Sequence, residues 1–269
     1  MVRIKKVKYK LKFLEQIIFK EEPEIAFLKS IFKRLKNILC IKIDKKCNSC
    51  NHNSKCLYYY MSSGDFKYIE TMPIIVERPL FSKRNFKAED QLELKFIFLG
   101  EAAKHIDFIE YILKEFEARG LFGEKYRFVI LNRSVEQVGK LKNNKNIKTI
   151  QVLTPIDRKE NIFIKEKEKL DKLNELYNIT DKAIKPINNL YEFDAVKFEI
   201  RSPLHLGANR FIQEGYIGTI KFEETVADSY LLDIINIIGA GKYYAIGGGV
   251  IKINKKDLWD SSPVPDVIA

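Results

Sequence analysis

The chain has 269 residues, enough for one large domain or two of about 130 residues. A hydrophobic content of 46% with 18 Phe and 13 Tyr excludes a disordered chain. The net charge of +11, from 47 Lys and Arg against 36 Asp and Glu, favours a polyanionic partner, although genome nucleotide bias also enriches lysine. The apolar runs are shorter than the roughly 18–20 residues that span a membrane, and the lysine-rich start differs from a signal peptide. We therefore expect a cytoplasmic protein without a membrane partner.

The first elements of the chain carry basic residues on their polar sides. Residues 1–15 alternate basic and apolar residues, which predicts a half-buried strand with lysines on its wet face. Pro23 begins a helix whose apolar residues recur at helical spacing to Leu39. This basic surface is either an ordinary solvated face or one that contacts RNA. Its basic residues are Lys29, Lys33, Arg34 and Lys36.

All four cysteines of the chain lie within 17 residues, at positions 40, 47, 50 and 56, with His52 among them. A C-x2-C pair flanked by two further thiols can supply the four soft ligands of a structural zinc ion. The alternatives are four reduced thiols, which are usual in a cytosolic protein, or an iron–sulfur cluster. We expect a zinc site formed by Cys40, Cys47, Cys50 and Cys56, with His52 as a substitute ligand.

The patterns that follow predict strands at 67–69 and 72–76, a clear strand at 92–99, a helix at 101–118 and a strand near 126–131. Together with the first strand and helix, and with 67–69 and 72–76 counted as one strand interrupted by a turn, the order is β-α-β-β-α-β. This order is that of the ferredoxin-like unit, in which one sheet carries both helices on a single face.

The second half has a weaker version of the same pattern. The polar stretch at 143–148 and the Lys/Glu-rich segment at 157–175 predict a linker and a solvated helix. Strands follow near 196–200 and 216–222, then a helix at 228–238 and a strand at 246–253. We therefore expect an α+β protein of two tandem ferredoxin-like (RAMP/RRM-like) domains with antiparallel sheets. The expected boundaries are 1–140 for the first domain with a Cys-rich insertion at 40–56, 141–190 for the linker and solvated helix, and 191–269 for the second domain.

A glycine-rich loop connects this last helix to the last strand. Residues 239–249 contain five glycines, so the backbone can reach positive φ repeatedly and bring bare amides against an anion. Lys242 adds a positive charge, while Tyr243 and Tyr244 offer rings for base stacking or hydroxyls for phosphate. Gly239 alone fits a simple helix stop. A loop packed inside the protein, shielded from solvent and away from any positive cleft, would contradict the RNA interpretation.

The pattern Gly239-Ala240-Gly241, five residues with a lysine, and then Gly247-x-Gly249 resembles the glycine-rich loop of the RAMP superfamily of CRISPR-associated proteins. Within that superfamily the chain is most similar to the precursor-CRISPR-RNA processing endoribonucleases, also over residues 78–131. Gly248 departs mildly from the pattern. The motif around Ser202-Pro203-Leu204 resembles this family too, but its extension to Gly207 is also similar to the non-cleaving RAMP backbone subunits.

The resemblance implies a metal-independent endoribonuclease that cleaves CRISPR repeat RNA into guide crRNAs by attack of a 2′-hydroxyl on its own phosphate. The products carry a 2′,3′-cyclic phosphate and a 5′-hydroxyl. Such a reaction needs positioning, a base and cations. Many members of the family carry a catalytic histidine on the first helix, where this chain has none. We expect His205 to be the base and Lys242, Tyr243 and Lys33 to assist it.

The expected RNA-binding residues are Lys29, Arg34, Gly239, Gly241, Lys242, Tyr244, Gly247 and Gly249. We expect CRISPR repeat RNA or crRNA as the partner, with a CRISPR effector complex as a further one. No cofactor is expected for catalysis. The alternative is a RAMP scaffold subunit that holds crRNA and cuts nothing.

Overall fold

A computed structural model of the chain describes residues 2–40, 47–79, 81–139, 141, 146–199, 204–211 and 214–255. The first unit contains β1 (Ile4–Phe13), α1 (Pro23–Leu39), β3 (Ile74–Glu77), β5 (Gln91–Leu99), α3 (Ile106–Arg119) and β6 (Phe128–Val138). Its antiparallel sheet has the order β3-β5-β1-β6. This order is that of a ferredoxin-like unit, as the sequence predicts.

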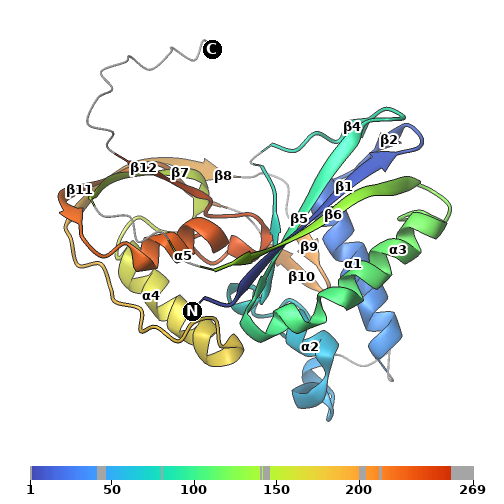
Figure 1. Cartoon of the computed structure of the whole chain (residues 1–269), viewed down its shortest axis with the longest axis horizontal. Coiled ribbons are helices and arrows are strands. Elements are labelled where there is room, and N and C mark those ends of the chain that lie inside the picture. The colour runs from blue at the N-terminus through green and yellow to red at the C-terminus, as the bar shows by residue number, and fades with distance from the viewer. Residues whose placement is uncertain are drawn as a thin grey trace.

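The alternation of β1 decides which face of this sheet is covered. Val7, Tyr9, Leu11 and Phe13 are buried, whereas the lysines between them are not. The helices α1 and α3 lie side by side over the buried face (Figure 1). Phe27 of α1 packs against Phe128 of β6, with ring centroids 5.3 Å apart. The other face of the sheet carries no helix of its own, and we call it the open face.

The second unit repeats this architecture. It contains β7 (Ile147–Ile156), α4 (Ile162–Tyr177), β8 (Tyr191–Glu199), β11 (Glu214–Val226), α5 (Tyr230–Ile238) and β12 (Ile251–Lys255). The sheet order β12-β7-β11-β8 matches that of the first unit strand for strand. A hairpin of β9 (Leu204–Leu206) and β10 (Asn209–Phe211) is inserted between β8 and β11. Two tandem ferredoxin-like units with antiparallel sheets are therefore confirmed.

The prediction that residues 141–190 form a linker and a solvated helix is wrong. Most of β7 pairs with β11 and β12 as an inner strand of the second sheet. The helix α4 buries a narrow stripe that includes Phe163, Leu170 and Leu173. Because lysine and glutamate fill the rest of α4, this stripe was hidden in a segment of charged composition. The second unit thus begins at β7.

Small elements complete the fold. The strands β2 (Ile17–Ile18) and β4 (Asn85–Phe86) pair beyond the first sheet, and the short helix α2 (Leu57–Met61) follows the cysteine segment. Residues 67–69 do not form the predicted strand; they precede and begin a 3-10 turn at Ile69–Thr71. Among the described residues, no helix combines the length and apolarity needed to cross a bilayer.

Candidate functional site

The glycine-rich loop lies at the junction of the two units and is buried except at Lys242. The amides of all five glycines donate within the chain: Gly239 to Ile235 O, Gly241 to Glu166, Gly247 to Tyr244 O, Gly248 to Tyr243 O and Gly249 to Pro155 O. An amide that already donates to a protein oxygen is not available to phosphate. The prediction that Gly239, Gly241, Gly247 and Gly249 bind RNA through their amides is therefore contradicted.

The loop needs glycine because the chain itself occupies the space of a side chain. A Cβ added to Gly247 would lie 2.3 Å from Cγ of Arg78, and one added to Gly249 would lie 1.8 Å from the carbonyl oxygen of Ala240. Both residues also have positive φ, 81° and 67°. Close approach of backbone to backbone, rather than of backbone to ligand, accounts for these two glycines.

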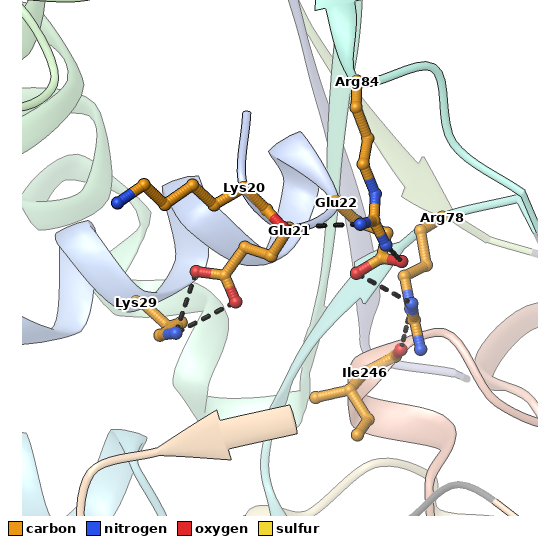
Figure 2. A network of polar contacts seen from close by, with 7 residues as sticks. All are labelled: Lys20, Glu21, Glu22, Lys29, Arg78, Arg84 and Ile246. Atoms are coloured by element: carbon orange, nitrogen blue, oxygen red, sulfur yellow. Dashed lines mark hydrogen bonds and ion pairs between the residues drawn. The ribbon is translucent and has the colours of Figure 1, made fainter. Parts of the chain in front are cut away.

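Arg78, after β3, attaches the loop to the first unit. Its Nε donates to the carbonyl oxygen of Ile246 at 2.5 Å, and its guanidinium lies 3.8 Å from Glu22 (Figure 2). Glu22 also binds Arg84 at 2.5 Å, so one carboxylate joins two arginines. Burial lowers the pKa of Arg78, while the charge of Glu22 opposes that shift. The side chain of Arg78 is buried, so this contact is a fixed part of the junction.

A second set of contacts attaches the loop to the second unit. Glu166 accepts the Gly241 amide, and Lys169 Nζ donates to the Gly239 and Gly241 carbonyls. Asp157 accepts the Lys242 amide at 3.0 Å. Burial alone would raise the pKa of Asp157, but Arg158 and this amide outweigh it and hold the pKa below its usual value. The loop is thus held from both units.

The open face of the first sheet carries a row of lysines along its inner strand β1. Lys6, Lys8, Lys10 and Lys12 alternate with the buried residues of β1, so all four project from the open face. Lys95 of β5 lies directly opposite Lys8. Two of these lysines form loose pairs with neighbouring glutamates, 3.4 Å for Lys6–Glu77 and 3.7 Å for Lys8–Glu93, whereas Lys12 binds Glu89 at 2.9 Å. Partly exposed pairs of this kind bind weakly and are easily exchanged for phosphate.

Two adjoining pockets extend from this row to the loop. One of ≈ 210 Å³ is lined by residues that include Lys6, Lys8 and Lys95, and one of ≈ 430 Å³ is lined by residues that include Lys95, Gly247 and Gly248. Because the pockets share Glu77 and Lys95, they form one groove, which we call the junction groove. The loop therefore borders a groove with charges of both signs, although its glycine amides are directed inward. The charged lining residues are Lys6, Lys8, Lys95, Arg78, Glu24, Glu77, Glu93 and Glu136.

Glu24 lies deep in the junction groove. Its side chain is 4% exposed and Oε2 has no hydrogen-bond partner. Burial raises the pKa of this carboxyl, while Arg78 acts in the opposite direction.

The four predicted catalytic residues lie on separate elements. His205 is exposed on β9, opposite Arg210, and Lys33 is exposed on α1. The hairpin and α1 both contact Asp65. The Asp65 carboxylate accepts a hydrogen bond from Lys36 of α1, and the Asp65 carbonyl accepts one from Asn209 of β10. Lys242 and Tyr243 lie instead in the loop beside Asp157, with Nζ of Lys242 4.7 Å from the Tyr243 ring. The structure describes no contact between the two pairs.

The remaining predicted RNA-binding side chains are already engaged. Lys29 binds Glu21 at 2.8 Å, and Arg34 binds Glu115 at 2.8 Å. The hydroxyl of Tyr244 donates to Met72 O at 2.7 Å, and the side chain is 0% exposed. Since a fully buried ring cannot stack on a base, the prediction for Tyr244 is wrong.

The four cysteines are free thiols, each half-buried. In the part of the chain that the structure describes, no three His, Cys, Asp or Glu side chains form a group that could hold a metal ion. Burial, followed by the charge of Asp65, raises the pKa of the Cys47 thiol, which disfavours the thiolate that zinc binds. The residues as arranged do not fit a zinc site, and structural zinc stays a prediction.

The lysine row of β1 was not predicted from the sequence as a candidate site. The alternation of residues 1–15 already indicated a lysine-bearing face, but nothing in it distinguished a solvated edge strand from an inner strand bordering a groove. Arg78 was missed because its partners, Glu22 and Ile246, are distant in the sequence.

Comparison with known proteins concerns both sequence and fold. The family model described as "AF_1859_N: N-terminal domain" matches residues 2–172. Two solved structures, described as "Cas6-RT-Cas1--Cas2 complex" and "Partial Cas6-RT-Cas1--Cas2 complex", are each similar with 11% identity and a TM-score of 0.51. The match covers 95% of this chain and 29% and 47% of theirs. A Cas6 product complex has 12% identity over 94% of this chain and 100% of its own, with a TM-score of 0.49. Identities this low establish a shared fold only. A search of curated proteins finds no match.

Proposed function

This chain belongs to the AF_1859_N family, whose N-terminal domain matches its residues 2–172, and from that premise we propose that it binds CRISPR repeat RNA in the junction groove. The observation that carries the proposal is the lysine row of β1, of which Lys6 and Lys8 line the part of the groove that the first sheet forms. Regularly spaced lysines on a sheet attract a phosphate backbone without specifying its sequence. The proteins of similar fold that are described as Cas6 complexes support CRISPR RNA as the polyanion.

The binding proposal is tested by the salt dependence of affinity. Each lysine that neutralises a phosphate of single-stranded RNA contributes about 0.7 to the slope of log K against log salt. We expect the double variant Lys6→Ala/Lys8→Ala, at the two β1 lysines that line the groove, to weaken repeat-RNA binding and to reduce the slope by about 1.4. The control is Lys114→Ala, which removes the charge of one exposed lysine on α3. Equal slopes for the double variant and the wild type would reject the groove as the RNA site.

Cleavage is the more specific part of the proposal. His205 would take the proton from the attacking 2′-hydroxyl, since an imidazole titrates near neutral pH. Lys33 on α1 would stabilise the charge that develops on the phosphate. The support is that both side chains are exposed and that the β9–β10 hairpin and α1 both contact Asp65. Lys242, the exposed residue of the loop, would contact the RNA outside the groove together with the adjoining Tyr243.

Incubation with repeat RNA in EDTA tests this chemistry. A product ending in a 2′,3′-cyclic phosphate is expected from the wild type. His205→Ala should lower the cleavage rate about 100-fold or more without a matching loss of affinity. His52→Ala, which also removes an exposed histidine, should cleave normally. If His205→Ala cleaves as fast as wild type, His205 is not the base.

A non-cleaving scaffold that holds crRNA is the second candidate function. It is favoured by the separation of His205 and Lys33 from Lys242 and Tyr243, and by the lack of a histidine on α1. Tight binding of repeat RNA without any product in the same incubation would support the scaffold and reject the nuclease.

A further inference from the structure

A pocket of ≈ 420 Å³ lies between α2, the turn after it and α4. A volume of this size is typical of small-ligand sites. None of its lining residues belongs to the junction groove. Four tyrosines from three segments of the chain line it: Tyr59 and Tyr60 of α2, Tyr68, and Tyr177 of α4.

The turn beside this pocket has an unusual backbone. Ser63, Gly64, Asp65 and Phe66 have φ values of 45°, 74°, 60° and 65°, so four consecutive residues are left-handed and three of them are not glycine. Each such non-glycine residue is strained, because its Cβ lies close to the following carbonyl oxygen. Conformations of this kind persist where other contacts hold them in place, and they are concentrated at ligand sites.

Asp65 supplies the contacts that hold the turn. Its carboxylate accepts Lys36 Nζ at 2.9 Å and the hydroxyl of Tyr58, and its amide donates to Ser62 Oγ at 2.9 Å. Its carbonyl accepts Asn209 of β10. The turn is thus fixed from α1, α2 and the hairpin together.

The turn positions the rings of Tyr59 and Tyr68. A Cβ added to Gly64 would lie 3.0 Å from Cδ2 of Tyr68 and 3.4 Å from the hydroxyl of Tyr59. Gly64 therefore allows both tyrosines to approach the same point of the backbone. The ring of Tyr68 is 40% exposed and accessible from solvent.

The inner wall of the pocket is rigid. Tyr177 is 4% exposed, and its hydroxyl donates to Thr71 O at 2.7 Å. The rings of Tyr60 and Tyr177 are edge to face, with centroids 5.3 Å apart. Because the inner rings are held in place, a flat ligand would meet a preformed aromatic surface rather than a mobile one.

Positive charge lies at the rim. Lys172 of α4 lines the pocket, and Nζ of Lys67 lies 5.0 Å from the centroid of the Tyr68 ring. Both side chains are exposed, and neither forms an ion pair within the described segments. Aromatic rings alone would also suit a cationic ligand, but the two lysines would repel one. Rings inside and cations outside favour a planar ring that carries an anion.

We propose that this tyrosine pocket binds one nucleotide, with its base stacked on Tyr59 and Tyr68 and its phosphate toward Lys172 and Lys67. The nucleotide is either free in solution or an unpaired nucleotide of bound RNA. The second source rests on the proposed function, whereas the first does not.

The test titrates the full chain with AMP and UMP and, separately, with repeat RNA carrying single 5-iodouridines for photocrosslinking. Tyr68→Ala should weaken nucleotide binding about 5- to 100-fold, the range expected for one stacked base. Tyr68→Phe should bind as wild type, because stacking needs the ring and not the hydroxyl. Tyr111→Ala removes a tyrosine that is 62% exposed on α3 and should have no effect.

The outcomes separate the pocket from the junction groove. Crosslinks to Tyr59 or Tyr68 that disappear in Tyr68→Ala support an RNA nucleotide as the occupant. Binding of AMP or UMP that depends on Tyr68, in a protein that binds no RNA, supports a free nucleotide and rejects the proposed function instead. The pocket proposal is overturned if Tyr68→Ala and Tyr111→Ala bind every probe alike, or if the wild type binds RNA with crosslinks only elsewhere and no mononucleotide.

Discussion

Replacement of Gly249 by alanine tests whether the glycine-rich loop is a structural joint. The added Cβ would lie 1.8 Å from the Ala240 carbonyl oxygen, which leaves no room for it. The φ angle of Gly249 is 67°. A non-glycine residue in the left-handed region costs about 1–2 kcal/mol. Overpacking against a fixed backbone adds about 1–3 kcal/mol. We therefore expect Gly249→Ala to lower the free energy of unfolding by about 2–5 kcal/mol.

Gly123→Ala is the matched control for this substitution. Gly123 has a similar φ of 63°, but an added Cβ would have no heavy atom within 4 Å. It should therefore show only the backbone cost of about 1–2 kcal/mol. Thermal unfolding followed by circular dichroism measures both, with a shift of roughly 2–4 °C for each kcal/mol in a chain of this size class. If Gly249→Ala melts together with Gly123→Ala, the loop is not tightly packed, and amide binding of phosphate becomes tenable again.

Other predictions concern the contacts of the junction and the cysteines. Arg78→Met should cost about 3–5 kcal/mol in urea unfolding, because it leaves the buried Ile246 carbonyl without its donor and the buried Glu24 without the charge of Arg78. Arg84→Met, at an exposed partner of Glu22, should cost less than about 1 kcal/mol, and similar losses would contradict the assigned role of Arg78. Tyr244→Phe should cost about 1 kcal/mol through the bond to Met72 O, and an unchanged stability would argue against that bond. The pKa of Asp157 is lowered in the folded state, so its contribution to stability is present above the unfolded pKa of 3.8 and is lost as pH falls through the folded pKa. Asp157→Asn should therefore reduce the loss of stability at acid pH. Identical profiles of stability against pH for the variant and the wild type would refute this role of Asp157. Because the thiols are not grouped around a metal position in the described segments, dialysis against EDTA should leave the melting temperature unchanged, and a clear drop would instead support the predicted zinc.

Much of the first unit could be predicted because its signals are local. Pro23 and the apolar spacing after it predicted α1, which runs from Pro23 to Leu39. Alternation in residues 1–15 predicted β1 and its lysine face, and the run at 92–99 predicted β5. The helix predicted at 101–118 begins as a 3-10 turn at Gly100–His105 and continues as α3. In these segments each residue's environment follows from its neighbours along the chain.

The second unit and the candidate site depended on contacts that the sequence does not display. In α4, charged composition masked a stripe that becomes buried only against the rest of the second unit. The pocket tyrosines come from three segments, and a left-handed turn that no local pattern predicted places two of them together.

By itself the sequence determined that five of the eleven residues at 239–249, between a helix and a strand, lack side chains. Only the tertiary structure decided what occupies the space that those side chains would fill. A backbone without Cβ atoms can approach a phosphate or another backbone equally closely, and both uses select glycine. Here Arg78, Ala240 and the neighbouring loop residues take that space, because the two units meet at this loop and need it to pack.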